Sequence, residues 1–322
     1  MIRALWFEIG DAPPKEMNEE EARAILAEEK EEGALWVDLD SIQEEELGWL
    51  ERTFGFHPLA IEDCRSQNQR PKLEEYAGYL FLVLHAPRAG TTADEIVLDE
   101  LHIFLSHRYL VTVHDGPLAV TGETWERCRQ NGHRNKGVSH LFYVVCDRLV
   151  DNFFPLLDFM DEEIDRLEDV IVFSPSRQVL DNIFGMKQSL VHLRKIAAPE
   201  REVFNSLLYR RDPYLQAETF IYLRDVHDHL VRVYEMIDSY RDLMSNALDA
   251  YLSTVSNNLN EVMKRLTVIA TIFMPLSFLV GFWGQNFQQL PFDRPQFFIL
   301  SLVAIATVPA IMLLWFRLRG WT

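Results

Sequence analysis

Two long apolar runs near the C-terminal end constrain the fold of this 322-residue chain more than any other feature. The first, LTVIATIFMPLSFLVGFW, covers residues 266–283, and the second, FFILSLVAIATVPAIMLLWF, covers residues 297–316; neither contains a charged side chain. As helices, both are long enough to cross a hydrocarbon core of about 30 Å. The alternative is a pair of core helices buried in a soluble protein. We expect two transmembrane helices.

Charged residues at the ends of the two runs predict their orientation. Two basic residues, Lys264 and Arg265, precede the first run, and a basic tail over 317–322 follows the second; the loop over 284–296 has one acidic and one basic residue. Because positive residues favour the cytoplasmic side, both termini are expected in the cytoplasm of a multi-pass protein of the cell (inner) membrane. Two helices cannot enclose a hydrated pathway, so a channel would have to be an oligomer.

A single long helix is expected to lead into the first apolar run. No proline or glycine occurs between Pro213 and Pro275, and a helix over 214–274 would be roughly 90 Å long. Its apolar residues recur at steps of three and four: Leu223, Val226, Leu230, Val233, Ile237, Tyr240, Met244, Ala247 and Tyr251. This heptad pattern predicts a stalk over 213–265 that associates as a coiled coil.

Small and polar side chains form a stripe along the end of this helix. At 100° per residue, its members fall within an arc of roughly 120°. They are Asn260, Thr267, Thr271, Met274, Ser277 and Gly281. Small residues in transmembrane helices usually mark helix packing, and the alternative is that the stripe faces a narrow pore. The second run offers only Ser301 and Thr307, so it is expected to face lipid.

The first part of the chain mixes strand and helix signals. Strands are predicted at 34–39, 79–85, 101–105 and 109–114, the last two joined by a tight hairpin at the sequence HRY. Helices are predicted at 18–30, after the cap residue Asn18, and at 42–54, where Ser41 and Glu44 match a capping box and Gly55 ends the helix. These signals indicate an α/β domain over 1–136.

A helical pattern resumes at residue 138 and continues to about residue 210. It is expected to be interrupted near Ser174-Pro175 and Ala198-Pro199, since proline removes a helix hydrogen bond. The pattern predicts two antiparallel helices over 137–212 between the α/β domain and the stalk.

Charge and composition exclude several classes of protein. The net charge of −18 divides into +4 after residue 263, with five basic residues and one acidic, and −22 before it. An acidic body disfavours nucleic acid, whose binding depends on cationic side chains. The cysteines, Cys64, Cys128 and Cys146, form no CxxC pair. No phosphate-binding glycine loop or HExxH motif is present, so an enzyme is not expected.

Residues 260–287, NEVMKRLTVIATIFMPLSFLVGFWGQNF, resemble the CorA family of magnesium channels. The segments GFHPLAIEDC (55–64), QRPKLEEYAGYLFLVLH (69–85) and YLRDVHDH (222–229) are also similar to that family, in the expected order along the chain. The family signature is Tyr-Gly-Met-Asn at the outer end of the first span. Here the corresponding residues are Trp283, Gly284, Gln285 and Asn286, a Gly-Gln-Asn variant. A related branch, the ZntB-type zinc transporters, also varies the middle residue.

The resemblance implies a homopentameric funnel with an α+β cytoplasmic domain, an α/β/α sandwich, followed by long helices and a two-helix transmembrane hairpin. It implies a selectivity filter at residues 284–286 and a pore lined by first-span residues, among them Asn260, Leu266, Met274 and Ser277. Neutral amide oxygens can bind the water shell of Mg²⁺ without holding the ion too tightly to leave. Leu266 and Met274 would form apolar constrictions that gate by excluding water.

The sequence LRDVHDH places Asp225, Asp228 and His229 at i, i+3 and i+4 on one helix face. Such a run is usually a solvated face. The resemblance adds that Asp225 matches an acidic residue that binds regulatory Mg²⁺ between neighbouring subunits. Other carboxylates would complete the site, and the candidates are Glu95, Asp99 and Asp161. Filled sites would hold the channel closed.

Three functions are compatible with this sequence. The first is a Mg²⁺ channel driven by membrane potential, with Co²⁺, Ni²⁺ or Zn²⁺ as alternative ions. The second is a proton-coupled Zn²⁺ transporter, although the spans contain no His, Asp or Glu. The third is a membrane-anchored sensor without transport. The partners expected in each case are further copies of the chain, the lipid bilayer and divalent cations.

Overall fold

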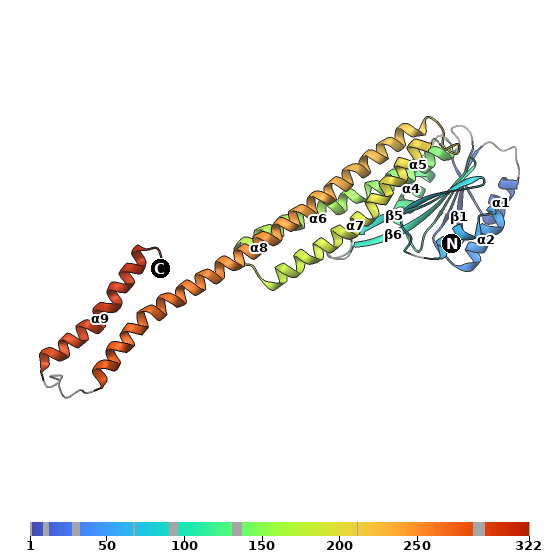
Figure 1. Cartoon of the computed structure of the whole chain (residues 1–322). Helices are drawn as coiled ribbons and strands as arrows, with labels where there is room; N and C mark the ends of the chain where they lie inside the picture. The colour runs from blue at the N-terminus through green and yellow to red at the C-terminus, as the bar shows by residue number, and fades with distance from the viewer. Residues whose placement is uncertain are drawn as a thin grey trace. The chain divides into compact units, whose positions relative to one another are not determined.

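The computed structural model describes residues 2–8, 13–27, 33–66, 68–89, 96–130, 137–210, 212–285 and 294–321. The chain divides into two compact units (Figure 1). The first comprises residues 1–170 and 176–248, and the second comprises residues 171–175 and 249–322. The helix α8, Thr219–Gly284, contributes residues to both units.

Seven strands within the described residues form one mixed sheet in the first unit. They are β1 (Ile2–Glu8), β2 (Lys15–Met17), β3 (Gly33–Leu39), β4 (Lys72–Tyr76), β5 (Tyr79–Ala89), β6 (Ile96–Leu105) and β7 (Tyr109–Val113). Their order is β2-β1-β3-β7-β6-β5-β4, and only β3 and β7 are parallel neighbours. The four predicted strands are present. The sequence analysis missed β1 and the polar edge strands β2 and β4, which lack the buried face that hydrophobic patterning detects.

Helices cover both faces of this sheet. One face packs against α1 (Glu19–Ala27), α2 (Glu44–Phe54) and α3 (Pro58–Arg65) through a buried apolar cluster that includes Leu47, Ile61 and Phe104. The opposite face contacts α4 (Ala119–Gln130) and α5 (Val138–Asp151); for example, the Trp36 and Trp125 rings lie 5.1 Å apart. The predicted α/β/α sandwich is confirmed.

Local capping signals were partly misassigned. The capping box forms at α1, where Asn18 Oδ1 accepts from the Glu21 amide and Glu21 Oε2 accepts from the Asn18 amide. The predicted box at Ser41 and Glu44 is wrong, because α2 begins at Glu44 itself, directly after Gln43. Gly55 ends α2 as predicted, with a left-handed φ of 68° that glycine tolerates best.

Three long helices lie side by side in the first unit: α6 (Phe153–Phe173), α7 (Arg177–Arg210) and the first part of α8 (Figure 1). The Arg194 side chain of α7 pairs with Asp238 of α8 at 2.8 Å. The heptad residues of α8 from Leu223 to Tyr251 are all buried within the single chain. The heptad pattern therefore reflects packing inside one subunit, and this stretch of the seam is not free for a second chain.

The long helices also differ from their predicted limits. α8 begins at Thr219 rather than residue 214, because the Ser139 hydroxyl binds the backbone at Tyr214 and Gln216 and holds that segment in turns. α7 runs through Pro199, so the predicted interruption there is wrong, whereas the break near Ser174 and Pro175 is present. Burial of the residues around Pro199 holds the helix despite the lost hydrogen bond.

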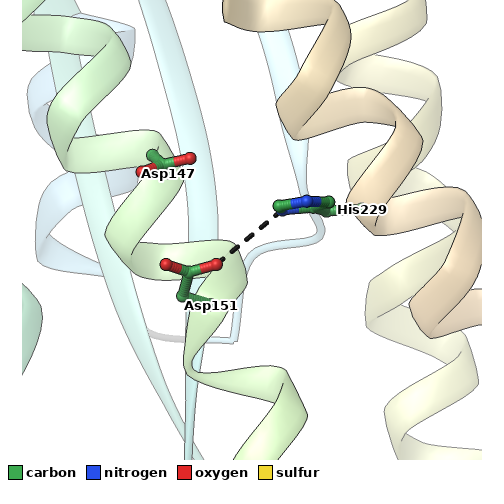
Figure 2. Close-up of side chains that lie close together, drawn as sticks. All are labelled: Asp147, Asp151 and His229. Atoms are coloured by element: carbon green, nitrogen blue, oxygen red, sulfur yellow. Dashed lines mark ion pairs between the residues drawn. The ribbon is translucent and has the colours of Figure 1, made fainter.

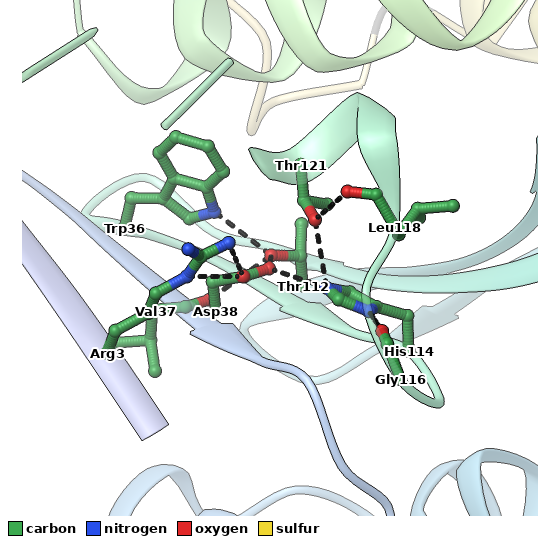
Figure 3. A network of polar contacts seen from close by, with 9 residues as sticks. All are labelled: Arg3, Trp36, Val37, Asp38, Thr112, His114, Gly116, Leu118 and Thr121. Carbon is green, nitrogen blue, oxygen red and sulfur yellow. Dashed lines mark hydrogen bonds and ion pairs between the residues drawn. The ribbon is translucent and has the colours of Figure 1, made fainter. Parts of the chain in front are cut away.

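A buried polar network lies where the parallel strands β3 and β7 end (Figure 3). Asp38 pairs with Arg3 at 2.7 Å and with His114 at 3.3 Å, and it accepts a hydrogen bond from Thr112. The Thr121 hydroxyl of α4 lies 2.9 Å from His114 Nε2. Because every charge in this network is paired, Asp38 is buried without an isolated charge, and its pKa is lowered by His114 and Arg3 against the effect of burial.

The second unit contains the two predicted membrane spans. Residues 266–283 form the end of α8, and residues 297–316 lie within α9 (Pro295–Leu318). Both helices are long and apolar enough to cross a membrane, and 6% and 0% of their apolar windows are buried in the chain. That exposure contradicts the core-helix alternative. α8 buries Val268 and half-buries Ile272, Leu276, Leu279 and Trp283, and these residues share one helix face.

Candidate functional site

The predicted pore stripe of α8 is exposed along its whole length. Each of its members, and Leu266 as well, is open in the single chain: Asn260, Leu266, Thr267, Thr271, Met274, Ser277 and Gly281. These residues do not overlap with the half-buried face around Val268. Lipid is a poor partner for an exposed amide and hydroxyl groups, so the stripe is available for contact with other subunits or with a pore.

The two threonines of the stripe bond to their own helix. Thr267 Oγ1 donates to the Met263 carbonyl at 2.8 Å, and Thr271 Oγ1 donates to the Thr267 carbonyl at 2.7 Å. Each hydroxyl oxygen is exposed and keeps lone pairs that can accept hydrogen bonds from the water around a cation. Met274 is 75% exposed and Leu266 is 58% exposed, so both can narrow a shared pathway with apolar atoms.

The predicted selectivity filter is described only at its beginning. Gly284 is the last residue of α8, and the Gln285 amide donates to the Phe282 carbonyl at 3.4 Å, which continues the helical turn. Asn286 lies outside the described residues. The filter remains a prediction from the sequence.

A second candidate site joins α5 to α8 in the first unit. Asp147 and Asp151 are one turn apart on α5, and they face His229 of α8 (Figure 2). One ligand atom from each of these residues lies within 4.8 Å of the others, and His229 Nδ1 is 3.7 Å from Asp151 Oδ1. Carboxylate and imidazole groups at this spacing can share a divalent cation.

Electrostatics at this site favour a bound cation. The pKa of Asp147 is raised by burial and by the nearby carboxylates of Asp151 and Asp225. The Tyr143 hydroxyl donates a hydrogen bond to Asp147. Burial, together with the negative charge of the nearby acids, raises the pKa of Tyr143 to about 12. Three carboxylates within one partly buried cluster repel one another, and a cation relieves that repulsion.

The structure separates the other predicted regulatory residues from this cluster. The Asp225 carboxylate lies near enough to this cluster to raise the pKa of Asp147. Asp228, in contrast, is exposed and pairs with His227 at 3.5 Å. Asp99 pairs with Arg88 at 3.3 Å on the sheet. Asp161 accepts a hydrogen bond from Tyr240. Within one chain these three do not join Asp225, and Glu95 lies outside the described residues.

Sequence reasoning missed Asp147 and Asp151. Their signal is present in the sequence, since two acidic residues at i and i+4 interrupt the apolar helix over 138–151. The same spacing separates Asp225 from His229. The pairing of the two helices could not be read from spacing alone.

Comparisons with known proteins converge on one family. The family model described as CorA-like Mg²⁺ transporter protein matches residues 31–318. The cobalt/magnesium transport protein CorA of Thermotoga maritima is 35% identical over 292 residues, which cover 89% of this chain and 83% of that protein.

Two solved structures share the fold. The CorA magnesium transporter of Methanocaldococcus jannaschii superposes with a TM-score of 0.84 at 23% identity, and the match covers 99% of this chain and 98% of that one. The ZntB cytoplasmic domain of Vibrio parahaemolyticus superposes with a TM-score of 0.63 at 12% identity, covering 80% of this chain and 99% of the domain.

Proposed function

Because this chain belongs to the family of CorA-like Mg²⁺ transporters, we propose that it carries divalent cations across a membrane, with Mg²⁺ as the principal ion. The name of the 35% identical relative, a cobalt/magnesium transport protein, supports Mg²⁺ and Co²⁺ as cargo. Ni²⁺ and Zn²⁺ are the remaining alternatives. Transport rather than catalysis agrees with the expectation that the chain is not an enzyme.

The observation that carries this proposal is the exposed stripe of α8. The stripe is uncharged, and it is open along about three helical turns on each side of Thr271. One chain cannot enclose water with two helices, so several copies must turn their stripes toward a common axis. Five copies, the number implied by the family resemblance, would surround a narrow pore.

Orientation follows from the charges at the helix ends. Lys264 and Arg265 lie at the start of the first span, and Arg317 and Arg319 lie at the end of the second. The positive-inside rule places both ends, and the acidic first unit, in the cytoplasm, and it places Gly284 outside. The location would be the cell membrane.

Movement of the ion needs no fuel in this arrangement. One elementary charge crossing 100 mV gains about 2.3 kcal/mol, and a divalent ion gains about twice that. The neutral amides of Gln285 and Asn286 at the outer mouth would hold the hydrated ion weakly enough for release. Apolar side chains at Leu266 and Met274 would close the pathway by excluding water.

The cluster of Asp147, Asp151 and His229 would sense internal Mg²⁺. A bound ion would offset the repulsion among Asp147, Asp151 and Asp225 and fix α5 against α8. Because α8 continues into the first span, an ion that changes the packing of α8 can bias the pathway.

Proton-coupled Zn²⁺ transport is the second candidate function. It is supported by the fold shared with the ZntB domain and by the variable middle residue Gln285. It is disfavoured because residues 266–283 and 297–316 hold no titratable group that could carry a proton. A sensor without transport is the third.

The test is ion uptake into proteoliposomes that contain the full chain. Mg²⁺ and Zn²⁺ are compared first under an imposed potential and then under an imposed pH gradient, with Asn286→Ala and the control Asn258→Ala. Potential-driven Mg²⁺ uptake that is lost only in Asn286→Ala supports the channel. Zn²⁺ uptake that follows the pH gradient would contradict the channel and support the proton-coupled transporter. Absence of uptake for both ions would support the sensor without transport.

A further inference from the structure

Two histidines flank a glutamate on the sheet face that α3 covers. His85 of β5 is paired in register with Glu100 of β6, and His102 lies two residues further along β6. Residues paired across antiparallel strands, and residues two apart on one strand, project from the same face. The three side chains therefore form a row on the sheet.

The row is deeply buried, and its polar atoms are poorly satisfied. His102 and His85 are each 3% exposed. Among the residues that the structure describes, both ring nitrogens of His102, Nδ1 of His85 and Oε2 of Glu100 have no hydrogen-bond partner. The Val113 backbone lies near the His102 ring without hydrogen-bond geometry. Buried polar atoms without partners destabilise a fold, so their presence together requires an explanation.

The row borders a cavity of about 240 Å³. Glu100 and His102 line it, together with the buried residue Cys64 on α3. The cavity thus presents a nitrogen donor and an oxygen donor from the same face of β6.

We propose that this cavity binds a transition-metal ion of the Zn²⁺ or Co²⁺ class, held by His102 Nε2 and Glu100 Oε2, with water completing the coordination. The Asn68 amide is the positioning group, because it donates a hydrogen bond to Glu100 Oε1. His85 Nε2 lies 3.8 Å from the same oxygen. The hydrogen bond from Asn68 leaves Oε2 free for the ion.

The distance between His102 Nε2 and Glu100 Oε2 suits two ligands of one metal ion better than a direct hydrogen bond. His102 Nε2 lies 3.6 Å from Glu100 Oε2, which is too long for a hydrogen bond. Two ligands of a tetrahedral ion, each bound at about 2.0–2.1 Å, lie roughly 3.3 Å apart. A small closure of this gap would therefore admit an ion between the two atoms.

The donor chemistry selects against Mg²⁺. His102 is buried and offers an imidazole nitrogen as a ligand. A neutral imidazole suits Zn²⁺, Co²⁺ and Ni²⁺, whereas Mg²⁺ prefers oxygen ligands and retains its water. The site is distinct from the Asp147 cluster, and it does not depend on the proposed transport function.

The test measures Zn²⁺ binding to the full-length protein in detergent after metals are removed with a chelator. Calorimetric titration is carried out with excess Mg²⁺ present, which occupies carboxylate sites. The variants are Glu100→Gln and His102→Gln. The controls are His192→Gln, an exposed histidine of α7, and Asp147→Asn at the other cluster. Co²⁺ replaces Zn²⁺ in a parallel series, and its visible spectrum reports the coordination geometry.

We expect Glu100→Gln and His102→Gln each to weaken Zn²⁺ binding by at least tenfold and to abolish the tetrahedral Co²⁺ spectrum, while both controls retain them. Glu100→Gln keeps the acceptor for the Asn68 amide, so it tests the site even if His102→Gln fails to fold. Equal binding by wild type and Glu100→Gln would overturn the proposal. Loss of binding only in Asp147→Asn would overturn it as well, because the ion would then occupy the α5 and α8 cluster.

Discussion

His229 Nδ1 lies 3.7 Å from Asp151 Oδ1, and this contact joins α8 to α5 (Figure 2). The Nδ1 atom is buried and has no hydrogen-bond partner among the described residues, so it remains available as a hydrogen-bonding or ligand atom. Asp147 and Asp225 add negative charge beside it. We expect a bound cation to relieve the repulsion among these carboxylates.

Neutralising one acid of this cluster should make the protein less dependent on Mg²⁺. We expect Asp147→Asn to raise the apparent Tm of the metal-free protein, because it removes one of the mutually repelling charges, and to reduce the further rise in Tm that Mg²⁺ produces in wild type. Thermal unfolding with and without Mg²⁺ measures both effects. Asp228→Asn is the control, because Asp228 is exposed and separate from the cluster. An equal Mg²⁺ response in wild type and Asp147→Asn would contradict the site.

Burial of Glu200 predicts a loss of stability as the pH rises. Burial raises the pKa of Glu200 to about 8, from an ordinary 4.5, while the His85 amide donates to one of its oxygens. Between these values the folded protein keeps a proton that the unfolded chain releases. The free energy of unfolding therefore falls across this interval, by on the order of 3–5 kcal/mol in total.

Glu200→Gln removes this titration and keeps the acceptor for His85. Above pH 7 the variant should be more stable than wild type, and the two should converge toward pH 5. Denaturation midpoints of both proteins from pH 5 to pH 8.5 measure the difference. Parallel pH profiles would show that Glu200 does not carry a proton in the folded state.

Replacing each of two glycines by alanine should change the stability of the protein in opposite directions. A Cβ atom at Gly33 would overlap the Trp6 ring and lie 2.7 Å from the Phe7 carbonyl oxygen. We expect Gly33→Ala to destabilise the protein by about 1–3 kcal/mol. A Cβ atom at Gly48 meets only the flexible end of Arg52 at 3.1 Å. There, Gly48→Ala in α2 should stabilise by up to about 1 kcal/mol. Chemical denaturation of both variants tests this, and a stable Gly33→Ala would refute the packing at β1.

The exposed Met274 predicts an apolar constriction in the proposed pore. Met274→Ser should raise Mg²⁺ flux several-fold when internal Mg²⁺ is high, because a polar ring no longer excludes water. Uptake into proteoliposomes preloaded with Mg²⁺ provides the measurement. Ile269→Ser is the matched control, since Ile269 is also exposed but lies off the stripe. Equal leakage in the two variants would point to general disruption of the span instead of a gate at Met274.

Local signals in the sequence determined much of the architecture. Hydropathy located both spans, because the cost of exposing polar groups to lipid is visible in composition alone. Apolar β-branched and aromatic runs located the central strands β3, β5, β6 and β7. The absence of proline and glycine located α8, although its seam was assigned to association between chains instead of packing within one.

Tertiary structure decided the features that depend on neighbours distant in sequence. Pro199 stays inside α7 because its surroundings are buried, and the pKa of Glu200 is raised because that side chain is buried against β5. Asp151 reaches His229 only because α5 packs against α8. Propensity and hydropathy describe each segment by itself. Charge state, metal affinity and the side of a helix that is covered depend on which segments meet, and packing alone determines that.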